Sequence, residues 1–137
     1  MFIAGVPLRV FLIPGAALAV AIPLVLFNYP SLTNVDFTPA FVQKLCAIDT
    51  IRAIKESTGD SKRVHEIHRL CGDRLKVICG NPNAAFESIA LGCGTWVTGV
   101  MNAAPRSARR MLRLIRDHRD LSAARDIYYR HLLPLVD

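Results

Sequence analysis

Short apolar segments and longer amphipathic stretches alternate along this chain. The apolar segments lie within residues 22–33, 51–60, 75–81 and 94–100. Each is followed by a stretch in which apolar residues recur at helical spacing, and this alternation is typical of βαβ units. Segments that are apolar on both faces are expected in parallel sheets covered by helices. The pattern therefore predicts an α/β fold with four parallel strands.

Capping residues predict where the helices begin. Thr38-Pro39 combines a hydroxyl cap with a proline at the first helical position, and Asp60 is an acidic cap for a helix that Gly72 closes. The helices are expected over residues 38–47, 60–70, 83–90, 104–118 and 120–133.

Lys55 is the clearest candidate for a catalytic residue in this sequence. It lies near the end of the apolar strand that begins at Ile51, and catalytic groups collect at the carboxyl ends of parallel strands. If the strand alternates, Lys55 shares a face with Ile51 and Ala53. Apolar surroundings favour the uncharged amine that attacks a carbonyl to form a Schiff base. From this segment alone, a surface lysine at a strand end is an equally good interpretation.

Four motifs in and around these strands allow a comparison with known protein families. They are Phe27-Asn28-Tyr29-Pro30, Ile54-Lys55-Glu56-Ser57-Thr58-Gly59, a strand ending at Gly80, and the segment 94–100. In order and spacing they resemble the dihydrodipicolinate synthase / N-acetylneuraminate lyase family, whose members are Schiff-base aldolases built on a (β/α)8 barrel. The resemblance runs from about residue 20 to the end of the chain.

This resemblance implies a partial (β/α)8 TIM barrel over residues 20–137, with about strands 5–8, their helices and a C-terminal helix. A complete barrel typically needs about 250 residues, whereas this sequence has 137. The family's first four strands are absent, and so is its Gly-Thr-Thr/Ser-Gly-Glu segment. A half-barrel exposes strand edges and an apolar sheet face, so we expect a homo-oligomer or a complementing half-barrel as partner.

The resemblance also implies a lyase that acts on pyruvate or a related 2-oxo acid without a cofactor. Lys55 matches the lysine that attacks the keto carbon. Gly80 and Val97 match positions that line the pyruvate pocket, and Ser31 and Thr33 are expected on a loop facing the second substrate.

Two departures from the family pattern raise an alternative. Phe27 occupies the position of the catalytic tyrosine, and Tyr29, two residues on, is a candidate substitute although Pro30 is expected to end the strand. Leu32 stands where the lysine-biosynthesis synthases place an arginine, which argues against dihydrodipicolinate synthesis itself. The alternative is a catalytically inactive fragment or subunit that associates through its exposed sheet.

The N-terminal stretch is apolar and carries one charged residue, Arg9, in residues 1–26. A signal-like or membrane segment is one interpretation. Three prolines in this stretch disfavour a single helix. We expect residues 1–19 to be an apolar remnant, and a membrane-associated or exported protein is the second alternative.

The cysteines, histidines and arginines bear on the cellular location and on metal and nucleic-acid binding. The four cysteines occur singly, which favours reduced thiols and a cytoplasmic location. His65 and His68 lack further ligands nearby, so no metal site is expected. The net charge of +6 arises mostly from C-terminal arginines that recur at helical spacing, which predicts a solvated helix face and no nucleic-acid partner.

Overall fold

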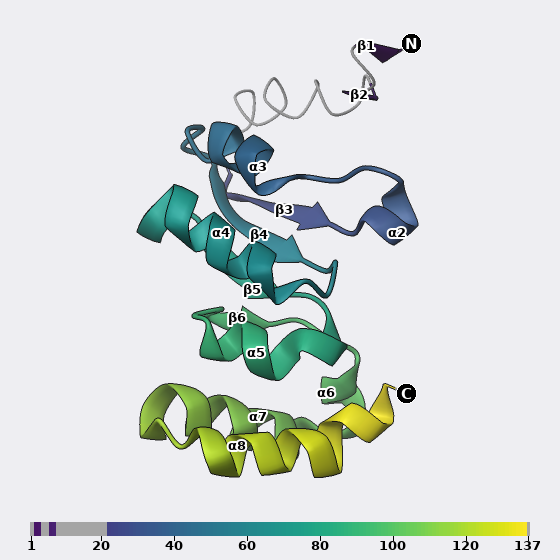
Figure 1. Cartoon of the computed structure of the whole chain (residues 1–137), viewed down its shortest axis with the longest axis vertical. Helices are drawn as coiled ribbons and strands as arrows, with labels where there is room; N and C mark the ends of the chain where they lie inside the picture. The colour runs from purple at the N-terminus through teal and green to yellow at the C-terminus, as the bar shows by residue number, and fades with distance from the viewer. Residues whose placement is uncertain (1, 4–5, 8–21, 137) are drawn as a thin grey trace.

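The computed structural model describes residues 2–3, 6–7 and 22–136. They include a two-stranded antiparallel ribbon and a four-stranded parallel sheet with its helices (Figure 1). The ribbon pairs β1 (Phe2–Ile3) with β2 (Val6–Pro7). The expected division between residues 1–19 and 20–137 falls on residues outside this description, so it stays a prediction.

The sheet follows the order of the chain, as the alternation of segments predicted. Its strands pair in parallel, each with its neighbour in sequence. They are β3 (Leu24–Asn28), β4 (Ile51–Glu56), β5 (Lys76–Cys79) and β6 (Thr95–Trp96). Because all four run in the same direction, the segments that follow them meet at one end of the sheet.

Helical segments connect the strands and close the chain. They are α2 (Pro30–Thr33), α3 (Pro39–Leu45), α4 (Ser61–Cys71), η1 (Gly72–Arg74), η2 (Pro82–Ala84), α5 (Ala85–Ala90), α6 (Val100–Ala103), α7 (Pro105–Arg113), η3 (Leu114–His118), α8 (Leu121–Ile127), η4 (Tyr128–Leu132) and η5 (Leu133–Leu135). The expected caps are confirmed at Thr38 and Asp60, whose side chains accept hydrogen bonds from backbone N–H groups of the first turn. Asp120 caps α8 in the same way. No helix in the described ranges is long and apolar enough to cross a membrane.

The helix start predicted at Asn83 is wrong. Asn83 was expected to open the third helix, but the cap is Asn81, whose side chain accepts a hydrogen bond from the Asn83 backbone N–H at 2.9 Å. Pro82 follows it at the first helical position and begins the 3-10 turn η2, and α5 continues from there.

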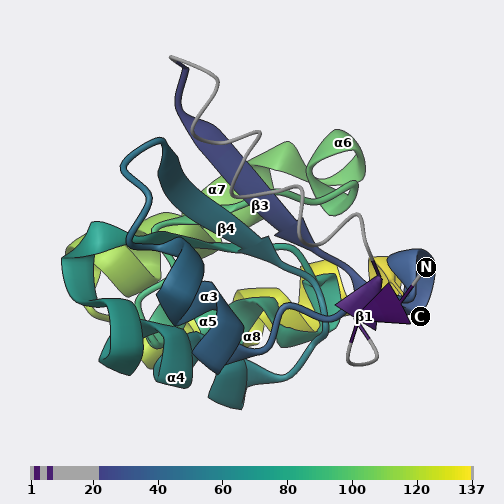
Figure 2. The same cartoon turned by 90° about the horizontal axis from the view of Figure 1, so that it is seen from above.

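The two faces of the sheet differ. Helices α3, α4 and α5 cover one face (Figure 2), where Leu26, Ile54 and Val77 are buried in the apolar core. The register pairs Val25 with Ala53 and Phe27 with Lys55, so these residues share the opposite face. On that face Val25 is 57% and Phe27 45% exposed, which shows that it is open along β3.

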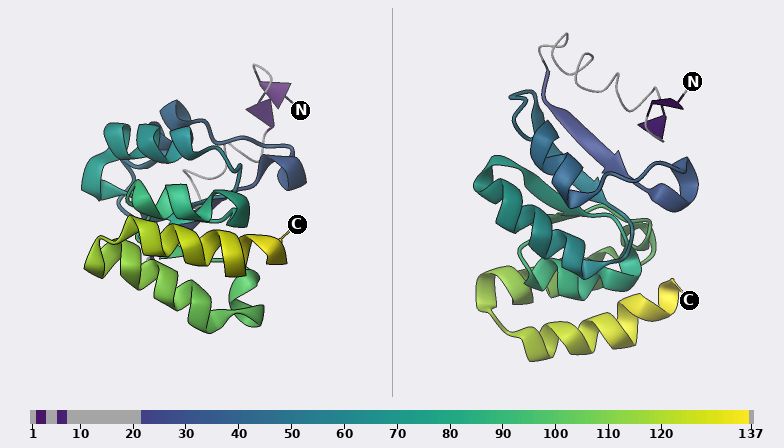
Figure 3. Two further views of the ribbon diagram at one scale, coloured as in Figure 1. Left: turned by 60° about the horizontal axis from the view of Figure 1, so that its bottom comes forward. Right: turned by 45° about the horizontal axis from the view of Figure 1, so that its top comes forward.

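Helices α7 and α8 form an antiparallel pair beside α5, beyond the β6 edge (Figure 3). Directly after α8, the hydroxyl of Tyr128 in η4 donates a hydrogen bond to the Pro82 carbonyl at 2.9 Å, which connects the helical pair to the strand-end loops. After α8 the chain returns to the side of the sheet where α2 and α6 lie (Figure 1). The last described residues therefore lie at the carboxyl ends of the strands.

Candidate functional site

Lys55 lies at the carboxyl end of β4 on the open face of the sheet. Its side chain is half-buried. The Nζ atom lies 4.1 Å from the centroid of the Phe27 ring on the neighbouring strand. A ring face at this distance attracts a cationic amine and restricts where the side chain can point. The amine is therefore held over β3.

Gly80, directly after β5, lies against the same lysine. Its backbone N–H donates a hydrogen bond to the Glu56 carbonyl at 2.7 Å. A Cβ atom at this position would overlap the Ser57 hydroxyl and would lie 2.9 Å from the Glu56 carbonyl oxygen and 3.0 Å from Lys55 Cε. The backbone carbonyl cannot turn aside as a side chain can, so glycine is what lets the β5 loop approach the lysine this closely.

A cavity of about 390 Å³ opens beside the amine. It joins three of the expected site residues: Lys55, Gly80 and Val97. The remaining wall comes from the loop after β5, the loop and helix after β6, and the C-terminus. These lining residues are Pro82, Thr98, Gly99, Val100, Ala103, Leu135 and Val136.

The other expected residues lie outside this cavity. β3 ends at Asn28, and Tyr29 precedes α2 with its ring centroid 5.8 Å from that of Phe27. Ser31 and Thr33 were expected on a loop, but they form part of the helical turn α2, because Pro30 begins a helix there. The Thr33 hydroxyl donates to the Tyr29 carbonyl at 3.0 Å.

A buried polar cluster lies on the opposite face of the same strand ends. The Glu56 carboxylate accepts hydrogen bonds from Asn28 Nδ2 at 2.9 Å and from the Thr58 backbone N–H at 2.7 Å. Asn28 Oδ1 accepts a hydrogen bond from the Phe37 N–H at 2.9 Å. Asn28 and Glu56 are 1% and 4% exposed, so these bonds satisfy groups that water cannot reach. The cluster fixes the residues next to Phe27 and Lys55.

An ion pair extends this cluster to α4. Arg63 donates two hydrogen bonds to the Asp36 carboxylate, and Asn28 Nδ2 donates to the same group at 3.2 Å. Partial burial opposes ionisation of Asp36, but the hydrogen bonds from Arg63 and Asn28 outweigh it and lower the pKa of the carboxyl below its usual range. The connection after β3 is thereby tied to the helix after β4.

Sequence reasoning missed Asn28 and Glu56 as structural partners of the site, and it missed the C-terminal wall. A signal for the first two was present, since each is a polar residue at the buried end of an apolar strand. Nothing local in Leu135 or Val136 indicates that they return to the lysine.

The four cysteines are free, as their single spacing predicted, and the structure shows that all four are buried. Burial raises the pKa of Cys93 to about 12, and burial together with the neighbouring Cys46 thiol raises that of Cys71 to about 12. These thiols therefore stay protonated near neutral pH and are poor nucleophiles.

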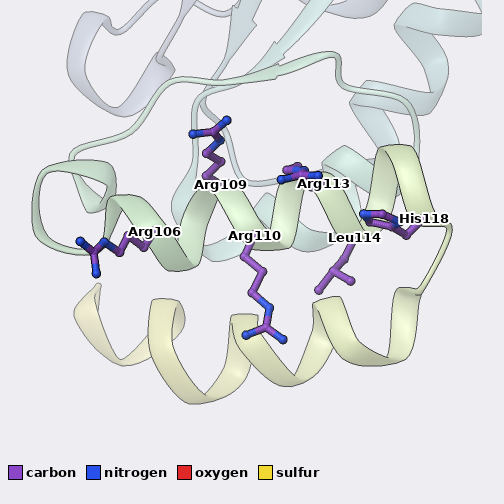
Figure 4. Close-up of a pocket in the computed structure, with 6 residues that line it drawn as sticks. All are labelled: Arg106, Arg109, Arg110, Arg113, Leu114 and His118. Carbon is purple, nitrogen blue, oxygen red and sulfur yellow. The ribbon is translucent and has the colours of Figure 1, made fainter.

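The arginine face of α7 is exposed, as its spacing predicted. A surface hollow of about 480 Å³ lies among the arginine side chains of this helix. Figure 4 shows Arg106, Arg109 and Arg110 pointing in three different directions instead of converging on a point. Arg113 lies 3.8 Å from Asp117 in an exposed pair. No group of three or more potential metal ligands occurs within the described residues, which include His65 and His68.

Comparison with known proteins agrees with this geometry. The 4-hydroxy-tetrahydrodipicolinate synthase of Syntrophobacter fumaroxidans is 40% identical over 119 residues, which are 87% of this chain and 40% of that protein. The enzyme of the same name from Acidithiobacillus ferrooxidans is 40% identical over 89 residues, which are 65% of this chain and 31% of that protein.

Solved structures likewise match most of this chain and less than half of their own length. The crystal structure of dihydrodipicolinate synthase from Aquifex aeolicus superposes with a TM-score of 0.85 at 29% identity, over 95% of this chain and 45% of that one. The chloride-inhibited dihydrodipicolinate synthase from Acinetobacter baumannii, solved with pyruvate, superposes with a TM-score of 0.82 at 26% identity. The superposition covers 90% of this chain and 43% of that one. These values confirm a partial barrel, because the chain spans less than half the length of each of these relatives.

Residues 16–137 match the Dihydrodipicolinate synthetase family, which is most of the chain. The match includes β3 to β6, Lys55 and the cavity beside it. The family expected from the four motifs is therefore confirmed, and this chain belongs to the dihydrodipicolinate synthetase family.

Proposed function

We propose that this chain is a Schiff-base-forming lyase of the aldolase, dehydratase or deaminase type that acts on pyruvate or a related 2-oxo acid. The observation that carries the proposal is the position of Lys55 Nζ. It lies at the carboxyl end of a parallel strand, beside a cavity of about 390 Å³ and against a glycine that admits close approach. Membership of the family supports the same chemistry. No cofactor is needed for it.

The chemistry begins with the unprotonated amine of Lys55 attacking the C2 keto carbon of the acid. A C–N bond forms and the carbonyl oxygen leaves as water after two proton transfers, which gives a protonated imine. The imine withdraws electrons from C3, so that a bond to C3 can be made or broken. Phe27 cannot carry the protons, and Tyr29 is the nearest candidate, with its ring 5.8 Å from that of Phe27.

Borohydride trapping tests this proposal directly. The protein is incubated with pyruvate, reduced, and weighed by intact mass spectrometry. We expect a stable adduct that Lys55→Ala abolishes. Lys76→Ala is the matched control, because Lys76 is an exposed lysine on the neighbouring strand β5 outside the cavity. Absence of the adduct from folded protein, or its persistence in Lys55→Ala, would contradict the proposal.

A second candidate is an inactive subunit that associates through its sheet. The open face, with Val25 and Phe27 exposed beside Lys55, favours it, as does Phe27 at the tyrosine position. On this proposal the partner is a second copy of the chain or a polypeptide that supplies the missing half-barrel. Four free cysteines support a cytoplasmic location in either case.

A further inference from the structure

Among the described residues that line the cavity beside Lys55, one side chain is charged, that of Lys55 itself. The other described residues of the lining are apolar or small, apart from Thr98, which is polar. Val97, Val100 and Leu135 supply branched apolar groups from three different segments. A ligand bound to the amine would therefore extend into apolar surroundings.

Among the residues that the structure describes, no second cation lines this cavity. Arg63 is already paired with Asp36, and it belongs to the cluster on the opposite face of the strand ends. A second carboxylate carried by a substrate would lose water without gaining a charged partner, which is costly. An apolar group at the same place would lower the free energy of binding, because apolar surface is removed from water.

The C-terminus supplies one side of this wall. Leu135 ends η5 and is 50% exposed, whereas Val136 is partly buried and packs against the core. Val100, at the start of α6, is 7% exposed on another side. The apolar lining is thus packed at Val100 and Val136, whereas Leu135 and Val97, which is 46% exposed, lie at its open edge.

We propose that the site selects 2-oxo monocarboxylic acids with an apolar side chain over 2-oxo dicarboxylic acids. This inference rests on the proposed function of Lys55 as the imine-forming residue. The C1 carboxylate and C2 keto group are common to both classes, so the discrimination comes from the part of the acid beyond C2. A volume of about 390 Å³ accommodates a short branched chain.

The test is competitive borohydride trapping with pyruvate, 4-methyl-2-oxopentanoate and 2-oxoglutarate at equal concentrations. Each rate of adduct formation is divided by the rate of the same acid with Nα-acetyl-lysine, which corrects for the reactivity of the keto group. Lys55→Ala gives the background. We expect 4-methyl-2-oxopentanoate to exceed 2-oxoglutarate about tenfold or more, the discrimination typical of an apolar pocket.

A pair of variants tests the wall itself. Leu135→Arg places a guanidinium at the edge of the cavity and is expected to shift the ratio at least about threefold toward 2-oxoglutarate. Leu121→Arg is the matched control, because Leu121 lies on α8 outside the cavity and is 49% exposed, almost the same as Leu135. Its ratio should equal that of the unaltered protein.

The outcomes separate this inference from the function on which it rests. If pyruvate is trapped, and 2-oxoglutarate is trapped at a rate equal to or greater than that of 4-methyl-2-oxopentanoate, the inference is overturned and the proposed function stands. An unchanged ratio in Leu135→Arg would also overturn it. Failure to trap any of the three acids at Lys55 would overturn the proposed function, and the inference with it.

Discussion

At the scale of single residues, the site depends on close contacts around one amine. Phe27 faces Lys55 Nζ at 4.1 Å, and Gly80 brings the β5 loop against the lysine side chain. The Ser57 hydroxyl is buried beside Gly80 and has no hydrogen-bond partner among the described residues. There is consequently no free volume at this point for even one additional carbon.

Replacement of Gly80 by alanine should therefore damage both stability and trapping. The new Cβ would meet the Ser57 hydroxyl and, at 2.9 Å, the Glu56 carbonyl oxygen, so the loop must move. We expect a loss of about 1–3 kcal/mol in the free energy of unfolding, as for overpacking elsewhere. Urea denaturation measures it. Gly94→Ala is the control, since nothing lies within 4 Å of its added carbon, and equal losses in the two variants would contradict the argument.

The buried thiols give a second prediction at this scale. With pKa values of about 12 for Cys71 and Cys93, on the order of one thiol in ten thousand is ionised at pH 8. We expect iodoacetamide to leave both unmodified in the folded protein and to alkylate all four cysteines in urea. Peptide mapping after timed alkylation checks this. Rapid labelling of Cys93 in the folded chain would show that it is not buried.

At the scale of elements, the Asn28–Glu56 contact and the Asp36–Arg63 pair tie β3, β4 and α4 together behind the lysine. Their side chains lie on the face opposite Lys55, so they act on it through the backbone. Distortion of this cluster would move the strand ends relative to each other, and with them Phe27 and Lys55.

The Asp36–Arg63 pair predicts a pH dependence of stability. Because the pKa of Asp36 is lowered in the folded chain, the pair stabilises above the unfolded pKa of about 3.9 and is lost as the pH falls through the folded value. Asp36→Asn should cost about 1 kcal/mol or less at pH 7, because the carboxylate side chain is 37% exposed, and the difference should shrink below pH 4.

Urea denaturation of both proteins from pH 7 to pH 3 measures this difference. Asp73→Asn is the control, since Asp73 is exposed and has no ion pair within the described ranges. A constant difference between Asp36→Asn and the unaltered protein across this range would contradict the assignment.

Local sequence signals account for most of the elements and for only part of the site. Strands and caps could be predicted because an apolar run or a Thr-Pro pair carries its own information. Asn81-Pro82 is the same kind of signal as Thr38-Pro39, and it was overlooked in favour of Asn83. Helix α6 is four residues long, too short for a periodic pattern. The Leu135 wall depends on the return of the chain from α8, which no local pattern encodes.

At the scale of the whole molecule, the sheet is covered on one face and open on the other. Val25 is 57%, Phe27 45% and Val97 46% exposed, and the β3 edge has no strand beside it among the residues that the structure describes. An apolar face next to an open edge favours association. The relatives that match, of which this chain spans less than half, extend beyond this portion of the barrel.

We therefore expect the chain to self-associate. Sedimentation velocity over a range of concentrations should show species heavier than the 15.1 kDa chain. Val25→Lys should shift the distribution to monomer, because it places a charge on the open face. Leu121→Lys changes a similarly exposed leucine on α8 and should have no effect. A strictly monomeric unaltered protein would contradict self-association and leave a different polypeptide as the partner.

The order of the sheet also bears on how the chain is synthesised. Because β3, β4, β5 and β6 each pair with the strand that precedes or follows them in sequence, every new unit can dock as it leaves the ribosome. Leu135 and Val136, which line one side of the cavity, emerge after all four of these strands. During translation the Lys55 amine is therefore open to water on this side until the segment after α8 has followed the strands out of the ribosome.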